Sequence, residues 1–208
     1  MIKSIIIGLV RLFFLALPIA VIWGIVWLVR RARKWEREKY DRIATALQGQ
    51  VIRDEKGQPV YVQTKRNDAE LRVWFDRERR DPHSDDHTQH TYLVLDWMTQ
   101  LGFTLFLCKD NVIFRMAEKL GTITDVEIGD PEFDKKYLIR SSDSAQVVAF
   151  FENPERRAAV NELFLKGFRE FWVTNQEVRI RRMYDPSRDL RPEFLQQYTV
   201  QLQKLVCG

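Results

Sequence analysis

Three histidines lie within eight residues of one another, in the segment DPHSDDHTQH at residues 81–90. His83, His87 and His90 are the only histidines of the chain, and two aspartates lie between them. Imidazole and carboxylate groups are ligands that zinc and other transition metals accept. The spacings of four and three residues would bring the histidines onto one face of a helix. The pattern therefore raises the hypothesis of a metal site, used by a hydrolase or a metal sensor.

The neighbouring elements decide between a metal site and a polar loop. Residues 71–78 and 91–97 are rich in the β-branched and aromatic residues that are typical of strands. Pro82, Ser84 and the two aspartates are turn formers, so the segment between these strands is predicted to be an exposed hairpin loop. A structural zinc site also needs four fixed ligands. We therefore expect no bound metal and no other cofactor, with the metal site as the alternative.

The sequence lacks the other common catalytic patterns. It contains no glycine-rich nucleotide-binding loop, no nucleophile elbow and no zinc-protease motif. Five acidic residues within residues 125–134 do not follow the calcium-loop spacing, and they predict a turn before a strand. Asp96 is a candidate buried carboxylate, which we expect to be paired or capping rather than catalytic. The sequence therefore favours a protein that is not an enzyme.

A long apolar segment lies near the N-terminus. Residues 5–29 are apolar except for Arg11, and residues 12–29 form a run of 18 apolar residues. As a helix this run would be about 27 Å long, close to the bilayer hydrocarbon thickness of about 30 Å. Its sequence ALPIAVIW is a poor cleavage site for a signal peptidase. We therefore predict a transmembrane helix over residues 1–29.

The positive charge of the chain lies just after this segment. The net charge is +4. Lys3 and Arg11 contribute +2, and residues 30–42 contribute +4 from seven basic and three acidic side chains, which leaves the chain from residue 43 at about −2. The positive-inside rule then predicts a bacterial inner-membrane protein with its N-terminus outside and its C-terminal domain in the cytoplasm. A domain without excess positive charge does not favour nucleic acid as a partner. The residues expected at the lipid interface, where anionic headgroups lie, are Arg11, Trp27, Arg30, Arg31, Arg33, Lys34 and Trp35.

Small residues recur on one face of the predicted span. Ala16, Ala20 and Gly24 are four residues apart, and Gly8 continues the same line. Small side chains at this spacing let a second helix approach closely within a bilayer. We therefore expect this face to pack against an integral membrane partner, or against a second copy of the chain.

The remaining sequence predicts a helical stalk and one domain. Residues 30–49 contain no helix breaker before Gly49, so the helix should continue as a basic juxtamembrane stalk that ends there. Residues 50–208 alternate strand-like runs with helical patterns, which predicts a cytoplasmic α+β domain of short antiparallel strands and helices. Strands are expected at residues 58–64, 69–78, 90–98, 103–109 and 133–142 and in a hairpin over 168–183, and helices at 111–121, 143–151, 153–167 and 190–205.

The late hairpin carries a second candidate surface. Trp172, Arg179, Arg181 and Arg182 give it an indole ring and three guanidinium groups. Such a surface can meet lipid headgroups or an acidic partner through charge and cation–π contacts. An ordinary solvated strand face is the alternative.

One motif carries a resemblance. The segment TDVEIGDPEFDKKYLIRSSD at residues 124–143 is followed by helices, a two-stranded hairpin and a terminal helix. In these features, residues 121–205 resemble a family of uncharacterised bacterial membrane-anchored proteins. Those proteins place one or two apolar spans ahead of the domain, so the resemblance implies a membrane anchor here. It implies no activity and no catalytic residue, and it does not cover the histidine segment.

Together these patterns predict a non-enzymatic, single-pass membrane subunit. Its helix would pack within a larger membrane assembly, and its cytoplasmic domain would dock on that assembly as a cap. This layout is similar to the one-helix, cytoplasmic-cap subunits of photosynthetic and respiratory complexes. The alternatives are a metal-binding hydrolase or sensor that uses residues 83–90, and a scaffold that binds anionic lipid at the membrane surface.

Overall fold

The computed structural model describes the whole chain except residues 1, 78–89 and 110–124, and the side chains of residues 2–19 are also outside the described part. The described residues form an eight-stranded sheet and five helices, which confirms the α+β class. The chain divides into two compact units, Met1–Lys39 and Tyr40–Gly208. The first unit is helical, and the second contains the sheet and its core.

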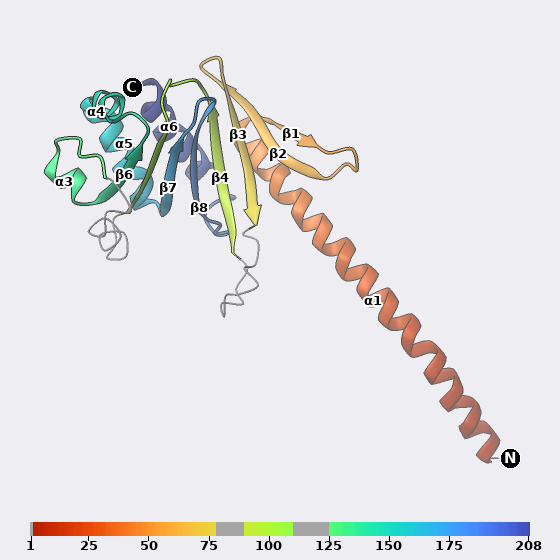
Figure 1. The fold of residues 1–208 in the computed structure, drawn as a ribbon. Coiled ribbons are helices and arrows are strands. Elements are labelled where there is room, and N and C mark those ends of the chain that lie inside the picture. The colour runs from red at the N-terminus through yellow and green to blue at the C-terminus, as the bar shows by residue number, and fades with distance from the viewer. Residues whose placement is uncertain (1, 78–89, 110–124) are drawn as a thin grey trace. The chain divides into compact units, whose positions relative to one another are not determined.

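Helix α1 (Ile2–Leu47) is continuous through the segments predicted as the span and the stalk (Figure 1). Among the residues that the structure describes, no helix is both long enough and apolar enough to cross a membrane. Much of the predicted span falls within residues 2–19, whose side chains lie outside the described part. The transmembrane assignment therefore stays a prediction.

The last turns of α1 are part of the second unit. The side chains of Tyr40, Ile43 and Leu47 are buried in its hydrophobic core. The hydroxyl of Thr64 donates a hydrogen bond to the carbonyl oxygen of Leu47 at 3.2 Å. The compact domain therefore begins before residue 50, where the sequence pattern had suggested its start.

Gly49 is needed at the end of α1 for a reason that the sequence did not indicate. The left-handed residue that ends the helix is Gln48, with a φ of 54°. The N–H of Gly49 donates to the carbonyl of Ala44 at 2.8 Å, as in a helix C-cap. A Cβ at Gly49 would lie 2.6 Å from the carbonyl oxygen of Gln63. Glycine is required there because two backbones approach closely.

The sheet is antiparallel throughout, with the strand order β1-β2-β3-β4-β8-β7-β5-β6. Consecutive hairpins join the first four strands, and the later hairpin inserts between β4 and β5 (Figure 1). The strands are β1 (Gln50–Arg53), β2 (Pro59–Arg66), β3 (Ala69–Arg77), β4 (Thr91–Met98), β5 (Leu105–Lys109), β6 (Tyr137–Ser141), β7 (Phe168–Val173) and β8 (Glu177–Met183).

Within the part of the chain that the structure describes, the helices of the domain cover one face of this sheet (Figure 1). They are α3 (Pro131–Asp134), α4 (Ser144–Glu152), α5 (Pro154–Leu165) and α6 (Pro192–Cys207). Because strand side chains alternate between faces, Val73, Leu95 and Ile180 point into the core with the helices. The residues next to them in sequence point to the other face, which we call the open face. Its central side chains are the candidates for function in this domain.

The predicted strands and the late hairpin are found, and so are the helices in the described part. Asn153 caps α5 by accepting a hydrogen bond from the N–H of Glu155 at 2.8 Å. Strand β1 and the one-turn helix α3 were not predicted. The predicted helix at 111–121 lies outside the described residues.

Carboxylates of the acidic segment around residues 125–134 accept hydrogen bonds from backbone N–H groups. Asp130 accepts from the N–H groups of Glu132 and Phe133 at the start of α3, and Asp134 accepts from the N–H of Ile128. Carboxylates at these positions satisfy N–H groups that a turn and a helix start leave free. The chain bends at Gly129 as predicted, but the one-turn helix α3 lies between this bend and β6, where the sequence predicted strand from residue 133.

Candidate functional site

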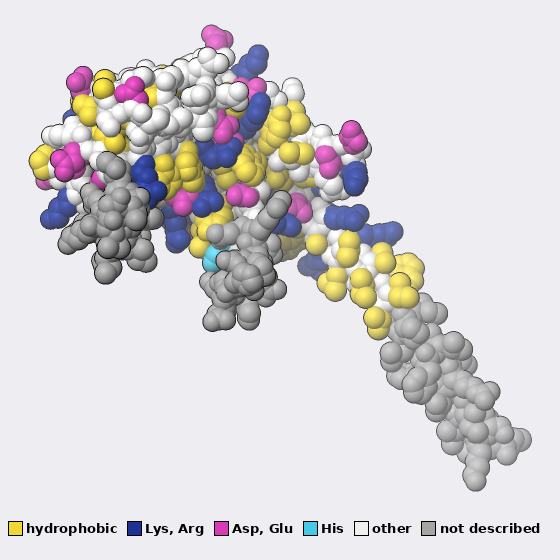
Figure 2. All heavy atoms as spheres, viewed as in Figure 1, with side chains coloured by type: hydrophobic (Ala, Val, Ile, Leu, Met, Phe, Trp, Pro, Cys, Tyr) yellow, Lys and Arg dark blue, Asp and Glu magenta, His cyan; other side chains and the backbone are white. Residues whose placement is uncertain are grey.

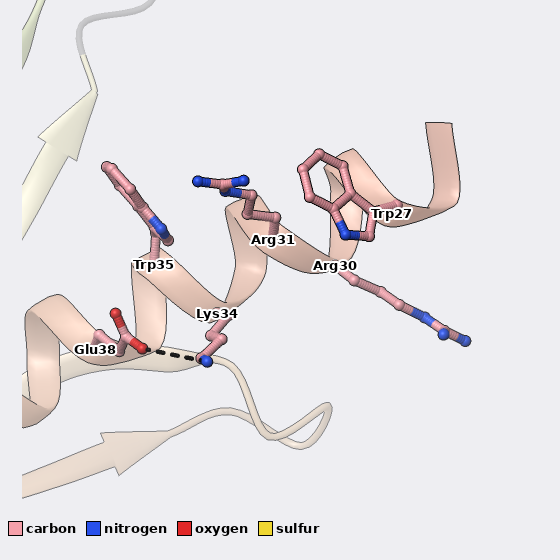
Figure 3. A pocket seen from close by; sticks show the side chains of 6 residues that line it. All are labelled: Trp27, Arg30, Arg31, Lys34, Trp35 and Glu38. Atoms are coloured by element: carbon pink, nitrogen blue, oxygen red, sulfur yellow. Dashed lines mark ion pairs between the residues drawn. The ribbon is translucent and has the colours of Figure 1, made fainter. Parts of the chain in front are cut away.

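A basic and aromatic surface lies on α1 within the first unit. It surrounds an open hollow of about 440 Å³, which we call the helix hollow. Figure 3 shows its side chains projecting from consecutive turns of one helix. The residues that line it are Trp27, Arg30, Arg31, Lys34, Trp35 and Glu38.

The helix hollow follows the four-residue repeat of the helix. Trp27, Arg31 and Trp35 lie on one face because residues four apart are neighbours there. The guanidinium carbon of Arg31 is 5.0 Å from the centre of the Trp27 ring, and Figure 3 shows Arg31 between the two indoles. The Lys34 ammonium lies 3.9 Å from the Glu38 carboxylate. Both members of that ion pair are well exposed, so it contributes little stability.

The structure brings together five of the seven residues predicted at a lipid interface. Arg33 lies on the same helix but does not line the hollow. The side chain of Arg11 lies outside the described residues. For the predicted packing face, Ala20 is exposed and Gly24 has open space where a Cβ would lie. The side chain of Ala16 and the surroundings of Gly8 lie outside the described part of the chain.

A second hollow lies on the open face of the sheet and has a volume of about 170 Å³. We call it the sheet hollow. Its walls come from β3, β4, β7 and β8, which are far apart in the sequence. In the space-filling view, hydrophobic, basic and acidic side chains are interspersed over the sheet (Figure 2). The residues that line the sheet hollow are Trp74, Asp76, Val94, Trp172, Thr174, Glu177, Arg179 and Arg181.

Asp96 is the central anchor of this face. It is 3% exposed and lies directly opposite Arg179 in the β4–β8 pairing. Its Oδ1 accepts from Nε of Arg179 at 2.7 Å and its Oδ2 from Nη2 at 3.1 Å. The indole N–H of Trp74 donates to the same carboxylate at 2.8 Å. Asp96 is therefore buried and paired, as expected from the sequence.

Arg181 forms the second group on this face. Its guanidinium donates to both carboxylate oxygens of Glu170 and lies 3.8 Å from the Asp76 carboxylate. It also lies over the rings of Tyr92 and Trp172, at 4.6 and 5.2 Å from their centres. These contacts fix the arginine between aromatic faces and carboxylates.

The arginines of the late hairpin do not form one free basic surface. Arg179 pairs with Glu177 at 2.7 Å as well as with Asp96. Arg182 points to the opposite, helix-covered face, where it is 5% exposed and lies 3.4 Å from Asp189. Of the four residues predicted as a partner or lipid surface, Trp172, Arg179 and Arg181 lie together. Arg182 does not belong to that surface.

Comparison with known proteins gives no match. No family model, no curated protein and no solved structure matches the chain. The resemblance of residues 121–205 to bacterial membrane-anchored proteins therefore stays a prediction.

The histidine segment is only partly described. His83 and His87 lie outside the described residues, and His90 directly precedes β4, with its ring centre 6.5 Å from that of Tyr92. In the part of the chain that the structure describes, no group of three His, Cys, Asp or Glu side chains is arranged to hold a metal ion. The antiparallel pairing of β3 with β4 confirms the predicted hairpin, whose two strands this segment connects.

Replacing Glu177 with glutamine is expected to change how stability depends on pH. Burial, and next the charge of Asp96, raises the pKa of Glu177 above its ordinary value of 4.5. A raised folded-state pKa means that the contribution of this group to stability is complete at low pH and is lost as the pH rises through that pKa. The variant lacks this loss, so its stability relative to the wild type should increase between about pH 4 and pH 7.

Urea unfolding of both proteins across that pH range checks this expectation. Glu193→Gln is the control, because Glu193 is exposed at the start of α6. A stability difference between Glu177→Gln and wild type that stays constant with pH would contradict the assignment.

Proposed function

We propose that this protein is a non-enzymatic, single-pass membrane subunit, anchored by α1 and carrying a cytoplasmic α+β domain that docks on a larger membrane assembly. The proposed anchor is the helix over residues 1–29, and the proposed location is a bacterial inner membrane with the N-terminus outside. The small-residue line of Ala16, Ala20 and Gly24 is the proposed contact with an integral membrane partner.

One observation carries the proposal. Within residues 21–29 of α1, eight large apolar side chains are each at least 40% exposed, and the basic segment follows them directly. Figure 2 shows these apolar side chains on the described part of the helix, next to Lys and Arg side chains. A long exposed apolar stretch that ends in Trp, Arg and Lys suits a bilayer and its interface. The residues are Val21, Ile22, Trp23, Ile25, Val26, Trp27, Leu28 and Val29.

The domain is proposed to act by contact rather than by catalysis. Asp96, which is buried on the open face, already accepts three hydrogen bonds from Trp74 and Arg179. The sheet hollow combines Trp and Arg side chains with satisfied charges, the composition that is typical of the centre of a protein–protein interface. This supports the open face as the docking surface.

The cysteines of the chain supply the test. Cys207 is exposed and Cys108 is buried, so a membrane-impermeant maleimide should report on Cys207 alone. In bacterial cells expressing the full chain, we expect labelling in inverted membrane vesicles but not in intact spheroplasts, with Cys207→Ser as the unlabelled control. After gentle detergent extraction, the protein should migrate in a large assembly of fixed stoichiometry.

Each part of the proposal would be overturned by a different experimental result. Release of the protein by alkaline carbonate would overturn the anchor. Labelling in intact spheroplasts would reverse the orientation. Migration as a monomer or a small homo-oligomer would overturn the role as a subunit.

A further inference from the structure

We propose that the helix hollow is a selective site for one anionic phospholipid, with Arg31 at the lipid phosphate. This inference rests on the proposed membrane anchor. It goes further, because an anchor needs only an apolar helix and has no need to distinguish one lipid headgroup from another.

The charge of the hollow favours an anion. Three basic side chains line it against a single carboxylate, and that carboxylate lies next to Lys34. In the described part of the chain, no carboxylate lies within ion-pair distance of Arg30 or Arg31. Two oxygens of a phosphate group can accept two parallel hydrogen bonds from one guanidinium group, which makes arginine well suited to this ligand.

The walls of the hollow favour a ligand that is also apolar. Trp27 and Trp35 are 55% and 64% exposed, one on each side of Arg31 (Figure 3). Tryptophan prefers the headgroup level of a bilayer, because its ring is apolar and its N–H is polar. Leu28, whose side chain is exposed, lies three residues before Arg31 and so on the same side of the helix. A phosphate joined to acyl chains satisfies both the cations and these apolar groups, whereas free phosphate satisfies the cations alone.

The position of Arg33 makes it possible to distinguish a specific lipid site from a diffuse attraction of basic side chains to anionic lipid. Arg33 is two residues after Arg31, which places it about 200° further around the helix axis. It carries the same charge at nearly the same depth, but it does not line the hollow. A diffuse attraction to anionic lipid would draw equally on both residues. A site between the two indoles depends on Arg31.

The experiment compares Arg31→Gln with Arg33→Gln in the full chain. Each protein is incorporated into nanodiscs of equal parts phosphatidylcholine and phosphatidylglycerol, and the lipids that remain bound are identified by native mass spectrometry. Wild type should retain one phosphatidylglycerol in preference to phosphatidylcholine. Arg31→Gln should lower this preference about tenfold, as expected for a lost charge-assisted hydrogen bond. Arg33→Gln should change the preference less than about twofold.

Three results would overturn the lipid site, the first two of which concern the lipid preference. One is an equal effect of the two variants, which would assign the preference to diffuse charge. The other is no preference in the wild type. Displacement of the lipid by millimolar glycerol phosphate would also overturn it, since it would reduce the site to an anion site. Neither variant alters the apolar segment, so both should remain in the membrane after carbonate treatment. Carbonate release of the wild type would instead be a failure of the proposed anchor.

Discussion

Asp189→Asn is expected to lower the free energy of unfolding by about 3–5 kcal/mol. Asp189 is fully buried beneath α6 and lies 3.4 Å from the guanidinium of Arg182, which is itself buried. The N–H of Asp185 and the hydroxyl of Tyr198 donate to the Asp189 carboxylate. Asparagine keeps the shape but removes the charge, and this leaves the cation of Arg182 in the core without a counter-charge.

Removing both charges of the Arg182–Asp189 pair is expected to destabilise the protein less than removing only one of them. Burial raises the pKa of Asp189 even though Arg182 lies beside it, so desolvation of the carboxylate outweighs the attraction between the two charges. We therefore expect Arg182→Met with Asp189→Leu to be more stable than either single charge removal. Arg182 also donates to the carbonyl of Lys166 and to Tyr198, so the double variant should recover only part of the loss.

Urea unfolding of the single and double variants forms a double-mutant cycle that measures this coupling. Glu193→Gln, at an exposed carboxylate in the first turn of α6, should change stability by less than about 0.5 kcal/mol. A single-variant cost below about 1 kcal/mol would show that the buried charges are not coupled in this way.

Asp96→Asn is expected to lower the free energy of unfolding by about 1.5–3 kcal/mol, the range for hydrogen bonds to charged groups. An amide offers one acceptor oxygen where the carboxylate offers two, so it cannot hold Arg179 and the Trp74 indole as the carboxylate does. We also expect the walls of the sheet hollow to loosen. Hydrogen exchange of the Trp74 indole N–H, followed by NMR, should become faster in the variant.

Asp76→Asn is the matched control on the same face. Its carboxylate is 39% exposed and lies 3.8 Å from Arg181, so the pair is largely solvated. We expect a change below about 0.5 kcal/mol and unchanged exchange at Trp74. Equal effects of the two variants would mean that Asp96 is not the central anchor of the open face.

The local elements of this fold could be predicted because their signals are local. The Asn153 cap, the hairpin over residues 168–183 and the alternation in β3 each depend on neighbouring residues. The pairing of β4 with β8 joins strands that are far apart in the sequence, and no short pattern determines which distant strands become neighbours. The contacts of Trp74 with Arg179 and of Tyr92 with Arg181 follow from that pairing, so the sheet hollow was missed.

The placement of Arg182 could have been predicted. In β8, alternation puts Arg179 and Arg181 on one face and Arg182 on the other, between Leu93 and Phe168 in the register. The helix hollow could also be read from the sequence, because Trp27, Arg31 and Trp35 follow a spacing of four. In both cases the repeat of the strand or helix determines which side chains share a face. Composition alone does not separate residues that point in different directions.

The burial of Tyr40, Ile43 and Leu47 has a mechanical consequence. Any force pulling on the N-terminal helix is transmitted directly to the centre of the domain, because the last turns of that helix fill part of its core. Detaching the helix would expose these side chains to water and break the hydrogen bond between Thr64 and Leu47. Tension on α1 would therefore be resisted by the core of the domain, and we expect a protease cut near Gly49 to destabilise the domain, because the end of α1 would no longer be joined covalently to the sheet.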